Sequence, residues 1–175
     1  MGRVGGTIEV GNERIAFEGK GNRDHSMGPR ELGGLKNHQW LQGYFDNGIS
    51  FLVYDAVLLG NVAPVFCEAV VYEGDKLFDG KLEYTNRIES VDDAKIPYGF
   101  KIHYKNGALE IRVREFVSTA YLSATAPSDM YVGVVQAGPP AFTLVEQTVR
   151  LELNGATAGF GNWERTVSGV LAVEV

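Results

Sequence analysis

Residues 100–116, FKIHYKNGALEIRVREF, alternate between apolar and polar side chains on both sides of an Asn-Gly pair. A period of two is typical of strands that bury one face, and Asn106-Gly107 can supply the two left-handed residues of a tight turn. The stretch therefore predicts a β-hairpin. Its apolar positions are Phe100, Ile102, Tyr104, Leu109, Ile111 and Val113.

Similar turn signals divide the rest of the chain. DNG at 46–48 joins 37–45 to 49–60, and YEGDKL at 72–77 joins 62–71 to 77–88. One short helical turn is expected over 90–97, where Pro97 stops it. Residues 154–169, NGATAGFGNWERTVSG, resemble a loop or a bulged strand. Further strands are expected near 4–10, 13–18, 117–124, 130–137, 142–153 and 158–175.

About ten strands with hairpin spacing in a single domain over residues 1–175 predict an all-β barrel or sandwich with little helix. Two strands favour a barrel. Both faces of 51–59 are largely apolar, with Asp55 on one face and Tyr54 on the other. In 36–45, the side chains of His38, Trp40, Gln42 and Tyr44 share a face, which suits a barrel interior that encloses a small ligand. The alternative is that Trp40 and Tyr44 are ordinary core rings.

Composition limits the partners. A net charge of −6 and a pI near 5.1 argue against a nucleic-acid binder and against an anionic membrane surface. The single cysteine, Cys67, cannot form an intrachain disulfide and is expected to be a buried structural thiol. No run of 18 apolar residues and no signal-peptide pattern occurs, so a cytoplasmic location is expected.

A glycine-flanked polar turn, GKGNRDHSMGPREL at 19–32, holds the most distinctive group of polar residues. The three histidines lie at spacings that match no metal site, and no phosphate-binding or dinucleotide fingerprint is present, so neither metal nor cofactor is expected. Residues 24–26 cannot form a Ser-His-Asp triad by themselves, because adjacent side chains point apart.

An aspartic acid in an apolar, aromatic-lined cavity has a chemistry of its own. Desolvation can keep the carboxyl group protonated near neutral pH, and such an acid can give its proton to an unsaturated substrate. Trp and Tyr ring faces can stabilise the positive charge that develops. If Arg23 instead pairs with Asp24, the turn is a structural staple.

The residues GNRDHSMGPREL, followed by WLQGYF and ISFLVYDAV, resemble the Gly-x-Arg-Asp-His-Ser-Trp-Gly-x-Arg signature of a lipocalin-like bacterial superfamily that includes carotenoid 1,2-hydratases (hydroxyneurosporene synthases). The resemblance is strongest over residues 2–60. It implies an antiparallel lipocalin-like (calycin-type) β-barrel of about 8–10 strands, with Asp24 and His25 at its ligand-facing end.

Two departures from that family stand out. Met27 occupies the place where many relatives have Trp, which removes one aromatic surface from the site. The better-known relatives are two barrels in tandem and the signature opens the second, so the chain resembles a second barrel. A surface that a first barrel would cover could then be buried in a homodimer.

Three hypotheses for function follow. The first is an enzyme that hydrates, isomerises or cyclises an apolar unsaturated molecule such as a terpenoid or polyketide, with Asp24 or Asp55 as the acid and His25 or His38 orienting it or water. The second is a non-catalytic binding module for an apolar ligand. The third is a purely structural role for the turn. The expected ligand-contacting residues are Met27, His38, Trp40, Tyr44 and Tyr54.

Overall fold

The computed structural model describes residues 2–21, 23–25, 35–83, 87–125, 129–132 and 142–168. The chain divides into two compact units, residues 1–31 and 32–175. Within the described ranges there is no helix long and apolar enough to cross a membrane.

The first unit is a two-stranded antiparallel hairpin of β1 (Gly2–Val10) and β2 (Glu13–Gly21). Gly11, at φ +60°, supplies a left-handed residue in the connecting turn. Alternation gathers the large apolar side chains on one face of the hairpin, and they remain exposed: Val4, Ile8, Val10, Ile15 and Phe17.

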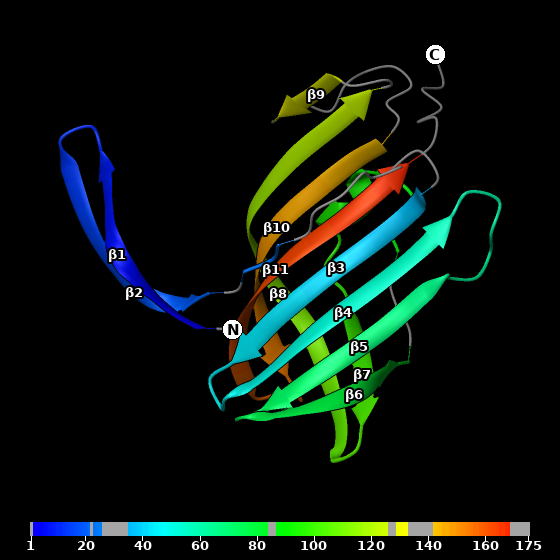
Figure 1. Ribbon diagram of the computed structural model, residues 1–175, viewed down its shortest axis with the longest axis horizontal. Coiled ribbons are helices and arrows are strands. Elements are labelled where there is room, and N and C mark those ends of the chain that lie inside the picture. The colour runs from blue at the N-terminus through cyan, green and yellow to red at the C-terminus, as the bar shows by residue number, and fades with distance from the viewer. Residues whose placement is uncertain are drawn as a thin grey trace. The chain divides into compact units, whose positions relative to one another are not determined.

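The second unit is an antiparallel barrel. Its strands are β3 (Leu35–Phe45), β4 (Ile49–Leu58), β5 (Phe66–Glu73), β6 (Lys76–Leu82), β7 (Gly99–Tyr104), β8 (Gly107–Thr125), β9 (Asp129–Val132), β10 (Phe142–Leu153) and β11 (Thr157–Ser168). They form a nine-stranded sheet in the order β10-β11-β3-β4-β5-β6-β7-β8-β9. Pairing of β10 with β8 closes eight of the described strands into a ring and leaves β9 on the edge of β8 (Figure 1). The predicted all-β antiparallel barrel is therefore confirmed.

The predicted hairpin at 100–116 is present as β7 and β8, but its turn differs from the prediction. Tyr104 pairs with Gly107, so the loop residues are Lys105 and Asn106, and of the predicted pair only Gly107 has a positive φ. The Asn-Gly pair with both residues left-handed is instead Asn154-Gly155, at φ 51° and 74°. It makes the β10–β11 connection a tight turn. Of the stretch 154–169, expected as a loop or a bulged strand, residues 157–168 form the regular strand β11, which overlaps the strand expected near 158–175.

β8 continues through 117–124, where a separate strand was expected, because β10 pairs along most of its length. Two register shifts leave Arg114 and Val117 without opposite residues on β10. A bulge adds one residue to one strand and reverses the alternation beyond it. Phe116 therefore packs against the core although Val113 also faces inward.

Large apolar side chains fill the barrel interior. The buried cluster draws on every strand of the ring and includes Phe45, Phe100 and Trp163, all at most 1% exposed. Gly43, on the inner face of β3, leaves room for two side chains of this cluster, Leu151 and Phe51. A Cβ atom at this position would lie 2.6 Å from both Leu151 Cδ1 and Phe51 Cε1.

Residues 87–98 cross one end of the barrel between β6 and β7. The segment contains the 3-10 helix η2 (Asp92–Lys95), which matches the short helical turn expected before Pro97. Ile88 and Ala94 are buried against Val145 of β10 and Val167 of β11. The end of the barrel is therefore closed by the chain's own backbone and side chains.

Gly43→Ala is expected to lower the free energy of unfolding by about 1–3 kcal/mol, because the added methyl group overpacks the core. Gly19→Ala in β2 is the control, since a Cβ there meets nothing within 4 Å. Urea denaturation of both variants measures the difference. Equal stabilities would contradict the tight packing at Gly43.

Candidate functional site

The two faces of β3 are reversed relative to the sequence prediction. Leu41 and Phe45 belong to the interior cluster, and Gln39 faces Asp55 across the β3–β4 ladder. The set His38, Trp40, Gln42 and Tyr44 does share one face, but that face is the outer one. The prediction that it lines the barrel interior is wrong, because both faces of β3 carry bulky side chains and alternation alone does not say which one points inward.

On the outer face, aromatic rings follow one another across three strands. The Trp40 ring on β3 lies edge-on to Tyr54 on β4, with centroids 5.3 Å apart. The ring centroid of Tyr54 also lies 5.8 Å from that of His38 and 6.0 Å from that of Phe66 on β5. We call His38, Trp40, Tyr54 and Phe66 the outer ring row. The predicted residue Tyr44 lies farther along β3 and stacks on Phe160 instead.

Two glutamates stand side by side next to this row. The register of the β10–β11 hairpin places Glu146 directly opposite Glu164, and Glu164 in turn lies opposite Trp40 of β3. Asn162 Nδ2 donates to Glu146 Oε2 at 3.4 Å. Like charges directly opposite each other in a ladder are unfavourable, so this pair stands out among the outer-face contacts.

His38 connects the glutamates to the outer ring row. Its Nε2 lies 2.8 Å from Glu164 Oε1, and its Nδ1 lies 2.6 Å from the Thr166 hydroxyl. Because a carboxylate oxygen only accepts, Nε2–H is the donor to Glu164, and the other ring nitrogen faces the Thr166 hydroxyl. These two contacts hold the ring, which is only 8% exposed, in place on both sides.

Glu146 on this face has a pKa far above the ordinary value of a glutamate. Burial, then hydrogen bonding with Glu164, then the charge of Glu164 raise the pKa of Glu146 to about 7, while the hydrogen bond from Asn162 opposes the shift. Two neighbouring carboxyl groups that share a proton behave as one coupled acid.

The arrangement can donate a proton beside an apolar surface. Glu146 supplies an acid whose pKa of about 7 keeps part of it protonated at neutral pH, and Glu164, paired with His38, supplies a neighbouring acceptor. Trp40 and Tyr54 offer π faces, and the Trp40 Nε1 atom is buried without a hydrogen-bond partner among the described residues. Within the residues that the structure describes, no three His, Cys, Asp or Glu side chains form a group that could hold a metal ion.

Asp55 lies on the same face of β4 as the interior residues Phe51 and Val53 and is fully buried. Arg87 binds it in a bidentate geometry, with Nε at 2.6 Å from Oδ2 and Nη2 at 2.7 Å from Oδ1. Hydrogen bonding to Asp55 is the largest cause of a raised Arg87 pKa. This geometry is that of a fixed ion pair, which anchors residues 87–98 to the wall of the barrel.

A buried polar network extends from this ion pair. Gln39 Nε2 lies 3.4 Å from Asp55 Oδ2, and the Tyr98 hydroxyl donates to Gln39 Oε1 at 3.1 Å. Arg165 of β11 is fully buried and donates to the Ala94 carbonyl oxygen at 2.8 Å. Burial lowers the pKa of Arg165 and raises that of Tyr98. The network ties the end segment to β3, β4 and β11.

Cys67 is exposed, which corrects the expectation of a buried structural thiol. β5 pairs with β6 only from Ala69 onward, so the first residues of β5 have β4 on one side alone. Partial burial, together with the charge of neighbouring Asp55, raises the pKa of the Cys67 thiol. The thiol is therefore not activated as a nucleophile.

The signature turn belongs to the first unit. Asp24 and His25 are exposed, and the Arg23 Nη2 atom donates to His25 Nδ1 at 3.3 Å. Met27 lies outside the described residues.

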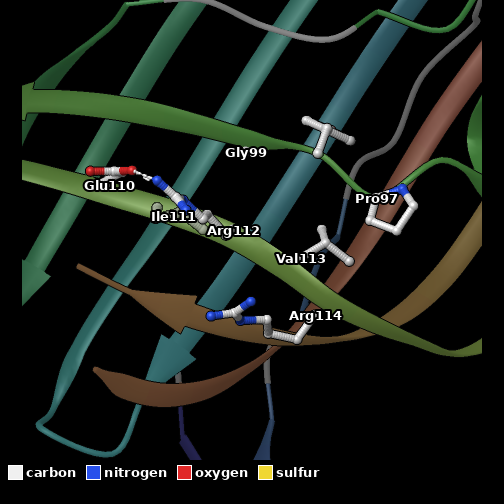
Figure 2. Close-up of a pocket in the computed structure, with 8 residues that line it drawn as sticks. Pro97, Gly99, Glu110, Ile111, Arg112, Val113 and Arg114 are labelled. Atoms are coloured by element: carbon white, nitrogen blue, oxygen red, sulfur yellow. Dashed lines mark hydrogen bonds and ion pairs between the residues drawn. The ribbon is translucent and has the colours of Figure 1, made fainter. Parts of the chain in front are cut away.

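Two open hollows among the described residues include no member of the outer ring row in their lining. One, of about 340 Å³, lies where the β7–β8 ladder ends, between Pro97–Gly99 and residues 110–114 (Figure 2). Its two arginines are already engaged, Arg112 by Glu110 and Arg114 by Glu152. The other, of about 170 Å³, is lined by Lys36, Asn37, Ile88, Glu89 and Val167 at the closed end of the barrel. The acid of the first hollow, Glu110, is paired with Arg112, and no aromatic residue lines the second.

Comparison with protein families decides the relationship of the chain. Residues 1–164 match the family model described as "Domain of unknown function (DUF7064)". The chain belongs to the DUF7064 family. No curated protein and no solved structure matched it. The DUF7064 match spans the β1–β2 hairpin and the barrel as far as Glu164, so it includes both glutamates of the outer face.

Arg87→Met in this DUF7064 chain is expected to lower the free energy of unfolding by about 3 kcal/mol, because it leaves the buried Asp55 carboxylate without its partner. Arg112→Met is the control, since its pair with Glu110 is exposed and contributes little. Urea denaturation provides the comparison. If Asp55→Asn added to Arg87→Met recovers no stability, the ion pair is not the cause of the loss.

Glu146 is expected to make the protein less stable as pH rises. Its folded pKa, about 7, lies above the ordinary value of 4.5, so between these pH values the folded state binds more protons than the unfolded state. The free energy of unfolding should then fall across this window, by about 1 kcal/mol after allowance for solvent screening of a half-exposed group. Glu146→Gln should remove this contribution to the pH dependence of the free energy of unfolding.

Urea denaturation at the two ends of the window measures the effect in both proteins. Glu115→Gln is the control, because Glu115 pairs with Arg150 on the surface. A Glu146→Gln variant with the same pH slope as the parent would show that Glu146 does not titrate in this window.

Proposed function

We propose that the chain is an enzyme that uses Glu146 as a proton donor to hydrate, isomerise or cyclise an apolar unsaturated small molecule. The observation that carries the proposal is the pairing of Glu146 with Glu164 directly beside the outer ring row. Two carboxyl groups directly opposite each other do not stabilise a β-ladder. They do place a proton donor beside a proton acceptor.

The chemistry follows from these groups. The Glu146 O–H gives its proton to one carbon of a carbon–carbon double bond, and the electron pair of the π bond forms the new C–H bond. The positive charge left on the other carbon lies against the faces of Trp40 and Tyr54, which attract cations. Addition of water followed by loss of its proton to the carboxylate gives the hydrated product, and loss of a different proton gives an isomer.

His38 acts as a positioning residue in this scheme. Its Nε2 contact with Glu164 at 2.8 Å holds that carboxylate beside Glu146, and the Thr166 hydroxyl fixes the ring from the other side. Water that hydrogen bonds to Glu164 would be oriented for addition.

The resemblance to the carotenoid 1,2-hydratase superfamily supports this class of reaction, because hydration of an apolar polyene needs an acid beside aromatic rings. The proposed acid differs from the sequence hypotheses. Asp55 is held in a bidentate ion pair with Arg87, and Asp24 is exposed. Glu146 combines partial burial with a like-charged neighbour, which are the two conditions that keep a carboxyl group protonated.

Deuterium incorporation tests the proposal. The protein is incubated in D2O with a panel of terpenoid and polyketide alkenes, and mass spectrometry detects carbon-bound deuterium. We expect labelling of at least one alkene, reduced at least 100-fold in Glu146→Gln, since general acids contribute about 10²–10⁴-fold to rates. Glu152→Gln is the matched control on the same strand, because Glu152 pairs with Arg114.

Labelling that persists in Glu146→Gln would exclude Glu146 as the donor. A ligand that stays bound but unlabelled after long incubation would instead assign the chain to the second hypothesis, a binding module for apolar molecules.

A further inference from the structure

We infer that the substrate of this face is an uncharged, elongated amphiphile, with a hydroxyl or carbonyl head at Glu146 and Glu164 and an apolar tail that runs along the outer ring row to Phe66. The inference rests on the proposed function and adds the shape, polarity and orientation of its substrate. It is argued from the order of side chains across five neighbouring strands.

The head position follows from the polar end of the row. Glu146 and Glu164 face each other across β10 and β11, with Asn162 and His38 hydrogen bonded to them. A carboxyl pair with one proton can donate to a carbonyl or hydroxyl oxygen and accept from a hydroxyl proton. This end therefore suits a head that both gives and takes hydrogen bonds.

Charge selects against an anionic head. A carboxylate or phosphate head would bring a further negative charge to two half-buried glutamates, and the net charge of the chain is already −6. The His38 ring is already engaged by Glu164 and by the Thr166 hydroxyl. An alcohol or a ketone carries no such cost.

The tail position follows from the apolar end. Beyond Trp40 and Tyr54 the row continues diagonally to Phe66, which is 53% exposed at the start of β5, while the exposed Glu68 lies directly opposite Tyr54. The connection that precedes Phe66 projects from the sheet between β4 and β5 and exposes Leu59 and Val62, the latter by 96% (Figure 1). Exposed apolar groups that continue a half-buried aromatic row are the expected contact for an apolar tail.

The length of the row sets the length of the substrate. From β10 to β5 the sheet order is β10-β11-β3-β4-β5, which is four strand spacings and about 19 Å. A compact molecule at the glutamates would reach Trp40 but not Phe66. An extended one would contact every member of the outer ring row.

Displacement of the neutral dye Nile red tests the inference with three probes: hexadecanol, hexanol and palmitate. Hexadecanol should bind at least tenfold more tightly than hexanol, which lacks the tail, and than palmitate, which has the same tail and an anionic head. Phe66→Ser should weaken hexadecanol about tenfold and leave hexanol unchanged. Tyr72→Ser is the matched control, an exposed aromatic residue on the same strand.

Equal affinities for hexadecanol and hexanol, tighter binding of palmitate, or no effect of Phe66→Ser would each overturn the inference. The outcomes separate it from the proposed function. Selective hexadecanol binding without deuterium labelling of any alkene would support the inference and refute catalysis. Labelling of a compact alkene without a preference for hexadecanol would support catalysis and refute the inference.

Discussion

Closure of the sheet between β8 and β10 is the constraint on which the rest of the barrel depends. Once the ring is closed, each side chain of the wall points either into the core or away from it. Bulky residues occupy the inside, and Gly43 is needed because Phe51 and Leu151 already fill the space beside it. The closed end takes residues 87–98 and their buried polar network. Because side chains fill the interior, the candidate site lies on the outer face of the barrel.

The alternation of the sequence predicted the antiparallel barrel and the residues that share a face on β3. It could not tell which face was the inner one, because His38, Trp40 and Tyr44 are as bulky as Gln39, Leu41 and Phe45. A distinguishing signal is Gly43, since a residue without a side chain on a strand marks a close approach in the core. The bulges at Arg114 and Val117 had no signal in the sequence, because they follow from how β8 wraps against β10.

The glutamate pair could have been found from the sequence. A turn placed at Asn154-Gly155 sets the register of β10 and β11, and that register brings Glu146 opposite Glu164. Asn-Gly pairs occur at both 106–107 and 154–155, and the second has a positive φ at both residues. The Arg87–Asp55 pair is different in kind. Its members are 32 residues apart, and Arg87 lies in an irregular segment whose path no periodicity predicts.

Asp55 and Glu146 show how the surroundings of a carboxyl group determine its role. Asp55 faces a guanidinium in the interior, so its negative charge is compensated and serves to hold the end segment in place. Glu146 faces another glutamate on the outside, where losing a proton would place two negative charges side by side. The first environment favours a permanent ion pair and the second a carboxyl group that exchanges its proton. In this barrel the Asp55 carboxylate on the inner face holds the end segment in place. The Glu146 carboxyl group on the outer face can gain and lose its proton near neutral pH.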